Sequence, residues 1–210
     1  LVRHVPRILR RAGLRPAYSQ GFNPRPKLQF TPPLPVGAEA EADACDVWVA
    51  SPDGDLPDAD TCLQRLQQAS LPGLELHSAR WLEEGEPALS KLCEGARYRF
   101  YPTTSPNAED VARRIAELLA REVWEVPRKG KKKKRHEVRL LDVRSSLAHL
   151  AWETDGDTPA LAFTLIQQPG GTIRPREVIG AALEQEEPPG RLVRRHHLRR
   201  QKDEDVILTG

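Results

Sequence analysis

The chain has 210 residues, of which 30% are charged and 39% are hydrophobic, and its formal net charge is +2. This length can bury a core without disulfides or metals, so folding alone requires no cofactor. The three cysteines lie far apart and show neither CxxC nor paired Cys/His spacing, which excludes a disulfide framework and a zinc motif. No apolar run approaches the roughly 20 residues of a membrane span, and no signal-peptide pattern is present. These features predict a cytoplasmic protein without a membrane partner.

Charge is strongly segregated along the chain. Residues 1–35 contain seven arginines or lysines and no carboxylate, whereas residues 36–94 contain thirteen carboxylates and three basic residues. Basic residues return in RKGKKKKR at 128–135 and in RLVRRHHLRR at 191–200. Such blocks of like charge either stay solvated or bind a polyanion.

Periodicity in the first half predicts two amphipathic helices and three strands. In the first helix, arginines lie on the faces that the apolar stripe does not cover. Pro6 falls in the first turn of this helix, where proline is tolerated. The predicted elements are a helix at residues 3–12, strands at 28–30 and 45–50, a helix capped by Asp58 that ends before Pro72, and a strand at 74–82. One further strand before Leu1 would complete a βαββαβ order.

The second half repeats much of this order. Ser105 is the predicted cap of its first helix, and RKGKKKKR falls at the tip of an inserted β-hairpin. The predicted elements are a strand at 96–101, a helix at 106–121, hairpin strands at 122–126 and 136–143, strands at 147–153 and 160–167, a helix at 175–183 and a last strand at 191–198.

Together these elements predict an α+β fold of tandem ferredoxin-like (βαββαβ) halves with antiparallel sheets. The first half, residues 1–92, lacks its N-terminal strand and contains the YSQGFNPRP loop. The second half, residues 93–185, contains the lysine-rich hairpin, and residues 186–210 form a basic C-terminal strand or tail. A single α+β domain is the alternative.

The stretch AYSQGFNPRPKLQF combines turn residues, cations and aromatic side chains. Gly21 and Asn23 tolerate left-handed backbone, and the prolines that follow stiffen the chain. Tyr18 and Phe22 are placed to stack on unpaired bases, although Phe22 could instead fasten the loop to the core. The predicted nucleic-acid-binding residues are Arg3, Arg7, Arg10, Arg11, Tyr18, Ser19, Gln20, Gly21, Phe22, Asn23, Arg25, Lys27, Lys129, Lys131, Lys132, Lys133, Lys134 and Arg135.

Three segments carry a family resemblance: RILRRAGLRPAYSQGFNPRPKLQF followed by LPVG, KGKKKKRHEVRLLDVR, and GGTIRPREV. They resemble the radical-SAM-associated family of uncharacterised bacterial proteins over most of residues 1–183. The resemblance implies a radical SAM protein fused to the chain or encoded beside it. Members usually carry a Ser-His-Leu-Asp segment before the first helix, and this chain begins just after that point. Where members have Ser-x-x-Glu after LPVG, this chain has Ala40 and Asp43, so a role for that serine is not carried over.

Enzymatic motifs are sparse. The chain lacks CxxxCxxC, so it is not itself predicted to hold a radical SAM cluster, and it lacks the glycine-rich phosphate loops. Histidines near lysines suggest a metal-independent ribonuclease as an alternative, but no nucleophile, base and orienting group are visible together. The histidines considered are His4, His136, His149, His196 and His197. An acidic loop with Glu39, Glu41, Asp43 and Asp46 lacks the spacing of an EF-hand, so no metal site is predicted.

The sequence therefore predicts an RNA-binding accessory protein, for tRNA or rRNA, that presents or recognises the substrate of a radical SAM enzyme. Phosphate contacts would position the RNA without reading its sequence, and no sequence-specific DNA binding is expected. No catalytic residue, metal or cofactor is predicted. One alternative is a protein-interaction module that docks on the radical SAM protein through the acidic segment. A second is the ribonuclease, related to tandem ferredoxin-like RNA-processing proteins.

Overall fold

The computed structural model describes residues 2–41, 43–51, 54–129, 138–169, 171–201 and 204–207. The chain divides into two compact units, each of which is described by itself. Unit 1 comprises Leu1–Thr31 and Ala44–Leu92, and unit 2 comprises Pro32–Asp43 and Cys93–Thr209. Residues 32–43 are thus an excursion from unit 1. The ends of the excursion are joined within unit 1, where the Thr31 N–H donates to the Ala44 carbonyl oxygen at 3.1 Å.

Unit 1 is built on the helices α1 (Val5–Arg11), α2 (Ala59–Ala69) and the short α3 (Leu89–Leu92). α2 begins where predicted, because the Asp58 carboxylate accepts the Thr61 N–H at 2.8 Å and so satisfies an N-terminal amide of the helix. The apolar stripes of α1 and α2 face each other. The buried side chains of this core are Ile8, Leu9, Ala12, Leu14, Cys62 and Ala69.

The strands of unit 1 are short: β1 (Arg15–Pro16), β2 (Leu28–Phe30), β4 (Cys45–Val47) and β5 (Val49–Ala50). β1 pairs with β5, and β2 pairs with β4, both antiparallel. Leu28, Val47 and Val49 pack against the helical core. The side chains that alternate with them point to the opposite face of the strands, away from α1 and α2.

One predicted strand of unit 1 is wrong. The described residues 74–82 form no strand, although their alternating pattern suggested one. Side chains hold this segment in place instead: Gln67 Nε2 donates to the Leu76 carbonyl oxygen at 2.8 Å, and Trp81 Nε1 donates to the Pro57 carbonyl oxygen at 3.0 Å. Leu74 is the residue of this segment that packs against the helical core. The segment thus has one apolar contact with the core and no strand pairing.

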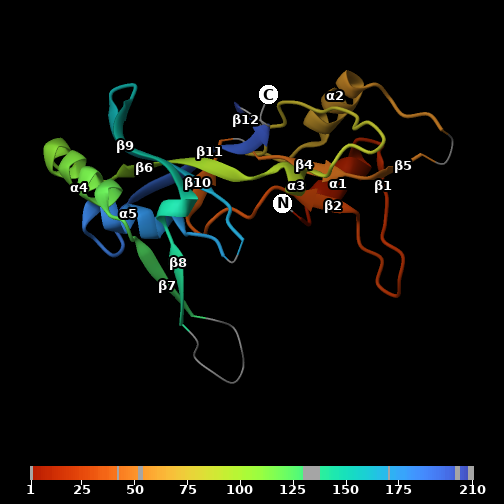
Figure 1. Cartoon of the computed structure of the whole chain (residues 1–210). Helices are drawn as coiled ribbons and strands as arrows, with labels where there is room; N and C mark the ends of the chain where they lie inside the picture. The colour runs from red at the N-terminus through yellow and green to blue at the C-terminus, as the bar shows by residue number, and fades with distance from the viewer. Residues whose placement is uncertain are drawn as a thin grey trace. The chain divides into compact units, whose positions relative to one another are not determined.

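Unit 2 is organised around a larger sheet (Figure 1). Its strands are β3 (Ala38–Ala40), β6 (Gly95–Pro102), β9 (Leu147–Asp155), β10 (Thr158–Ile166), β11 (Gly190–Gln201) and β12 (Glu204–Ile207). The strand order is β12-β11-β6-β10-β9, with antiparallel neighbours, and β3 adds to β11 in parallel. Helix α4 (Ala108–Ala120) follows β6, and α5 (Pro175–Leu183) follows β10. The hairpin β9–β10, α5 and the last strand β11 agree with the predicted elements.

Helices α4 and α5 lie side by side on one face of this sheet (Figure 1). Val111, Ile115 and Leu118 of α4 contribute the stripe that the sequence predicts, and Val178 and Ile179 contribute that of α5. From the sheet, the facing side chains are Tyr98, Phe100, Leu150, Leu161, Phe163, Leu165 and Leu192. The rings of Tyr98 and Phe163 stack with centroids 5.4 Å apart. This core therefore fixes which residues point to the other face.

The predicted inserted hairpin is present as β7 (Glu125–Lys129) and β8 (Val138–Asp142), an antiparallel ribbon separate from the main sheet (Figure 1). Its first strand lies three residues later than the predicted 122–126, so Arg128 and Lys129 belong to the strand and not to the tip. A short 3-10 turn, Arg144–Ser146, leads from β8 into β9. Residues 130–137, which include most of the predicted tip, lie outside the described residues. These include five of the predicted nucleic-acid-binding residues: Lys131, Lys132, Lys133, Lys134 and Arg135.

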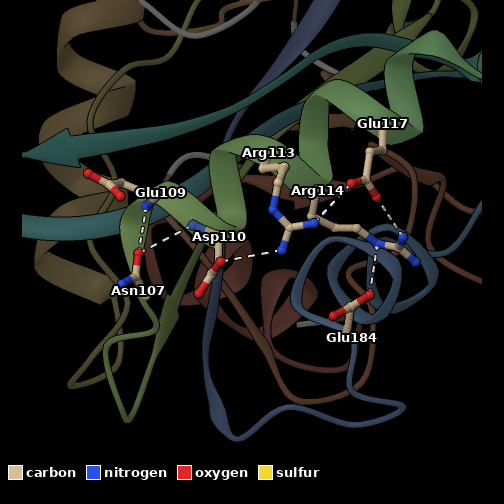
Figure 2. Close-up of polar contacts among 7 residues, drawn as sticks. All are labelled: Asn107, Glu109, Asp110, Arg113, Arg114, Glu117 and Glu184. Carbon is tan, nitrogen blue, oxygen red and sulfur yellow. Dashed lines mark hydrogen bonds and ion pairs between the residues drawn. The ribbon is translucent and has the colours of Figure 1, made fainter.

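The cap of α4 differs from the prediction. Asn107, not Ser105, is the N-cap: its Oδ1 accepts the Glu109 N–H at 2.9 Å and the Asp110 N–H at 3.3 Å (Figure 2). The helix therefore begins at Ala108, two residues after Pro106. Among the described residues, no helix has the length and apolar character needed to cross a bilayer.

Candidate nucleic-acid interface

Four arginines form a stripe along α1. Arg3 lies in the turn before the helix, and Arg7, Arg10 and Arg11 follow at spacings of four, three and one residues, which places all four on one side of a helix. All four are exposed, while Ile8 and Leu9 on the other side are buried. We call Arg3, Arg7, Arg10 and Arg11 the arginine stripe.

The loop of residues 18–26 is an insertion into one edge of the strands of unit 1. On one side of it, the Ala17 N–H donates to the Trp48 carbonyl oxygen at 2.7 Å. On the other side, the Trp48 N–H donates to the Lys27 carbonyl oxygen at 3.1 Å, and the Lys27 N–H donates to the Ala17 carbonyl oxygen at 2.8 Å. The loop therefore leaves and rejoins the strand opposite a single residue, Trp48.

A second set of bonds closes the loop nearer its tip. Tyr18 and Pro26 form a β-bridge, the Ser19 N–H donates to the Arg25 carbonyl oxygen at 2.8 Å, and the Arg25 N–H donates to Ser19 Oγ at 3.0 Å. At the tip, Gly21 has a φ of +134°, which residues with a side chain rarely adopt. The predicted role of Gly21 in shaping the loop agrees with this geometry.

The two aromatic residues of the loop have different surroundings. The Phe22 side chain is fully exposed, so the alternative in which it packs onto the core is wrong. The Tyr18 side chain is partly covered, and its hydroxyl oxygen accepts a hydrogen bond from Arg10 Nη1 at 3.0 Å. Tyr18 thereby ties the loop to the arginine stripe, and Phe22 projects at the tip beside the exposed Gln20 and Asn23.

The cations of this region lack acidic partners within the described part of the chain. Seven are exposed, and none of them lies within ion-pair distance of a described carboxylate. They are Arg3, Arg7, Arg10, Arg11, Arg15, Arg25 and Lys27. Unpaired, solvated cations next to an exposed aromatic ring suit phosphate groups and bases better than they suit a protein core.

The arginines of β11 are arranged in the opposite way. Arg191 Nη1 lies 3.2 Å from Glu39 Oε2, and Arg195 pairs with Glu41. In the sequence, residues 191–200 form a third basic stretch, and the segment around β3 belongs to a separate acidic one. In unit 2 these two segments are adjacent strands that neutralise each other.

Asp43 continues this pairing with two buried partners. Its Oδ1 accepts a hydrogen bond from Arg194 Nη2 at 2.7 Å and lies 3.1 Å from His197 Nε2. Arg194 and His197 are each 1% exposed, and Arg194 Nη1 also donates to the Pro32 carbonyl oxygen at 2.8 Å. His197, one of the histidines considered for the ribonuclease alternative, is therefore not available at the surface, because its ring is inside unit 2.

The structure also shows the surroundings of the other acidic-loop and histidine residues that the sequence singled out. Asp46 accepts the Leu89 N–H at 2.7 Å, and no described group of three His, Cys, Asp or Glu side chains could hold a metal ion. His149 lies on β9 as predicted, with Nε2 3.0 Å from Glu153 Oε1. Burial, then the charges of Arg97 and Arg195, lower the pKa of His196. His4 is exposed before α1, and His136 lies outside the described residues.

The sheet face of unit 2 that α4 and α5 leave uncovered contains a network of paired charges. Arg99 pairs with Asp155 and lies 3.7 Å from Glu153, and the Tyr101 hydroxyl donates to Asp155. These bonds, first that of Tyr101 and then that of Arg99, lower the pKa of Asp155. Burial, followed by the Asp155 carboxylate, raises the pKa of Tyr101. The charges on this face are thus largely satisfied within unit 2.

Charged side chains on the exposed side of α4 are also paired within unit 2 (Figure 2). Arg113 lies between Asp110 and Glu117, at 3.3 and 2.9 Å, and Arg114 lies between Glu117 and Glu184, at 3.1 and 3.3 Å. Arg113 and Arg114 thus have carboxylate partners, whereas the arginine stripe has none among the described residues.

Sequence reasoning missed one feature of unit 1. Lys27, Leu28, Gln29 and Trp48 line an open groove of about 310 Å³ at the base of the loop. Trp48 is 42% exposed, between Val47 and Val49, which face the core. The alternation in CDVWVA could have indicated an outward tryptophan, but nothing in the sequence placed it opposite the loop.

These observations define an α+β protein with an exposed cationic surface on unit 1. Residues 1–175 match the model of a family described as an uncharacterized protein conserved in bacteria (DUF2344), and the chain belongs to this family. No curated protein matches the chain. Membership of an uncharacterised bacterial family is thereby confirmed, and the association with radical SAM proteins stays a prediction.

Proposed function

We propose that the chain is an RNA-binding accessory protein, of the tRNA or rRNA class, that presents or recognises the substrate of a radical SAM enzyme. The observation that carries RNA binding is the set of exposed cations on α1 and the loop without described acidic partners. The radical SAM partner rests on the family resemblance alone. Catalysis by this chain is not part of the proposal.

The cations also have a suitable arrangement. The arginine stripe is continuous along α1, and the bond between Arg10 and Tyr18 holds the loop beside it. A polyanion that follows the stripe would release counterions from several phosphates, which is the main source of RNA affinity. Phe22 at the loop tip supplies an aromatic face on which an unpaired base could stack.

We further propose that the two halves are related ferredoxin-like folds. In unit 2 the order β6, α4, β9, β10, α5, β11 with antiparallel neighbours supports this assignment. In unit 1 the order of α1, β2, β4 and α2 supports it in part, and the absence of a strand at residues 74–82 weakens it.

A salt titration tests RNA binding. Fluorescently labelled tRNA and rRNA fragments are titrated with the full chain at several salt concentrations, and the slope of log affinity against log salt is measured. Steep salt dependence is expected, and the double variant Arg7→Ala/Arg11→Ala should reduce the slope by about 2, one per lost phosphate contact. Replacing the lysines at 131–134 by alanine should reduce it as well.

The matched control removes two exposed arginines that already have carboxylate partners. Arg113 pairs with Asp110 and Glu117, and Arg176 lies 3.7 Å from Glu187. The variant Arg113→Ala/Arg176→Ala changes the net charge equally and should leave the slope unchanged. Salt-insensitive binding, or binding no tighter than that of an unrelated protein of equal charge, would refute the proposed function.

Two outcomes would support the alternatives instead. Co-purification with the radical SAM protein after nuclease treatment, together with full function in vivo of Arg25→Ala/Lys27→Ala, would indicate a protein-interaction module. Cleavage of labelled RNA in the presence of EDTA would indicate the ribonuclease. Glu39 and Glu41, which belong to the acidic segment, already pair with arginines of β11, and this weakens the docking alternative.

A further inference from the structure

We propose that Trp48 and the face around it form a stacking platform for one unpaired nucleotide of the bound RNA. We call Trp48, Lys27, Gln29 and Arg15 the Trp48 platform. This inference rests on the proposed function and deepens it, because it names the form of RNA that unit 1 recognises: a strand with an unpaired base, not a continuous duplex.

The strand geometry places these side chains on one face. Leu28, Val47 and Val49 point into the helical core, so the alternating Lys27, Gln29 and Trp48 point outward. The pairing of β2 with β4 continues to Lys27 and Trp48, whose backbones share the 3.1 Å hydrogen bond. These outward residues, with Leu28 between them, line the open groove of about 310 Å³.

The charges of the platform suit a nucleotide. Lys27 stands opposite Trp48, and Arg15 stands opposite Ala50, which shares the face of Trp48. Both cations are exposed, and neither lies within ion-pair distance of a carboxylate in the described part of the chain. A base on the indole would therefore lie beside two cations of the neighbouring strand segments, which suit the phosphates of its strand.

A second exposed tryptophan of unit 1 lacks these properties. Trp81 is 41% exposed, almost as much as Trp48, but its Nε1 is bonded to the Pro57 carbonyl oxygen. The residues after it include Glu83 and Glu84, whose charge repels a phosphate backbone. Exposure alone thus does not distinguish the two residues. The indole nitrogen of Trp81 is already bonded, whereas Trp48 lies opposite Lys27. Asp46, which lies on the face of Trp48 opposite Gln29, already accepts the Leu89 N–H.

Stacking also decides which form of RNA fits. The bases of a duplex are covered by their neighbours, so an indole can stack only on a base that is unpaired, at a bulge, loop or end. The loop of residues 18–26 leaves and rejoins the strand at Trp48 and so borders the platform. A strand on the platform would lie next to this loop, whose Arg25 is exposed for a further phosphate.

The test uses the full chain and two probes, a single-stranded oligouridylate and an RNA duplex of equal charge, with affinities measured by fluorescence anisotropy. Trp48→Ala should weaken binding of the oligouridylate by about 5- to 150-fold, the range for loss of one stacked base. Binding of the duplex should change far less, because its bases are covered by their neighbours. Trp81→Ala is the matched control and should leave both affinities unchanged.

Salt dependence separates stacking from charge. Trp48→Ala should keep the slope of log affinity against log salt, because an indole releases no counterions, whereas Lys27→Ala should lower it by about 1. Should Trp48→Ala fold poorly, the pair Trp48→Phe and Trp48→Leu decides the matter. Phe keeps an aromatic face and should retain most of the affinity for the oligouridylate, whereas Leu fills similar space and should lose it.

The outcomes separate this inference from the proposed function. If Trp48→Ala and Trp48→Leu bind the oligouridylate as the unsubstituted chain does, while Arg7→Ala/Arg11→Ala binds less, the platform is refuted and RNA binding stands. Equal losses for Trp48→Ala and Trp81→Ala would also refute the platform. If the unsubstituted chain binds neither probe at low salt, the proposed function fails, and the platform fails with it.

Discussion

Arg194 donates a hydrogen bond to Asp43 at 2.7 Å and thereby joins the segment that follows β3 to the buried middle of β11. The two residues belong to stretches of opposite charge that are far apart in the sequence. Their contact shows why net charge along the chain is a poor guide to surface charge in unit 2. The acidic segment neutralises much of the last basic stretch, whereas the cations of α1 and its loop have no acidic partner among the described residues.

Loss of the Asp43 carboxylate should destabilise unit 2 strongly. In Asp43→Asn the charged Arg194 stays buried with its ion-pair partner removed, and breaking such pairs costs about 3–5 kcal/mol. The Asp43 side chain is 32% exposed, so we expect a lower value, about 2–4 kcal/mol, in the free energy of unfolding. Urea unfolding of the full chain measures it.

The control for this prediction is Glu41→Gln. Glu41 pairs with Arg195 in the same pair of strands, but both side chains are substantially exposed, and such pairs contribute about 0–1 kcal/mol. If both variants lose the same stability, the buried contact has no special weight in unit 2.

The fold was predictable from the sequence where an apolar repeat extends over a long element. α4, α5 and β10 each span nine or more residues with a continuous buried stripe, so local pattern and tertiary packing agree. β1 and β3 have two and three residues, too short for a periodic signal, and exist because β5 and β11 offer free edges. Residues 74–82 show the converse: they alternate, but no partner strand pairs with them.

The candidate site was predictable in composition and not in geometry. Turn residues and cations identified the loop, and helical spacing identified the arginine stripe. The pairing that places Trp48 at the base of the loop depends on residues 15–17 and 27–30 sharing one partner strand, which no local pattern reveals. The burial of His197 likewise depends on Asp43, which is distant in sequence.

The position of the α4 cap gives a second prediction. Asn107→Ala removes the side-chain acceptor of two first-turn amides and should lower the free energy of unfolding by about 0.5–2 kcal/mol. Ser105→Ala, at the cap that the sequence suggested, should change it by less than about 0.5 kcal/mol. Urea unfolding of both variants checks this, and faster hydrogen exchange at Glu109 and Asp110 in Asn107→Ala would locate the effect. A larger loss in Ser105→Ala would contradict the observed cap.

The low pKa of Asp155 gives a third prediction, on acid stability. A carboxyl group whose pKa is lowered in the folded state stabilises that state above its unfolded pKa, about 4, and this contribution disappears as the pH falls through the folded pKa. The Tyr101 hydroxyl is the largest cause of the lowering. Tyr101→Phe should therefore be less stable than the unsubstituted chain near pH 6, and the difference should shrink as the pH falls toward 3.

Urea unfolding at a series of pH values measures that difference, and an NMR titration of Asp155 should show a higher pKa in the variant. Tyr18→Phe serves as the control, because the Tyr18 hydroxyl contacts Arg10 and so should give a difference that does not depend on pH in this range. A pH-independent difference for Tyr101→Phe would mean that its hydroxyl acts without the Asp155 carboxylate.

The exposed ring of Phe22 gives the last prediction, in which stability and binding separate. Because the side chain is fully exposed, Phe22→Ala should change the free energy of unfolding by less than about 0.5 kcal/mol. If the ring stacks on a base, the same substitution should weaken binding of single-stranded RNA by about 1–3 kcal/mol. Val36→Ala, which removes another exposed apolar side chain, in unit 2, should affect neither quantity. Unchanged RNA affinity in Phe22→Ala would leave the loop with phosphate contacts alone. A large loss of stability would instead mean that Phe22 packs against the protein in solution, as the rejected alternative requires.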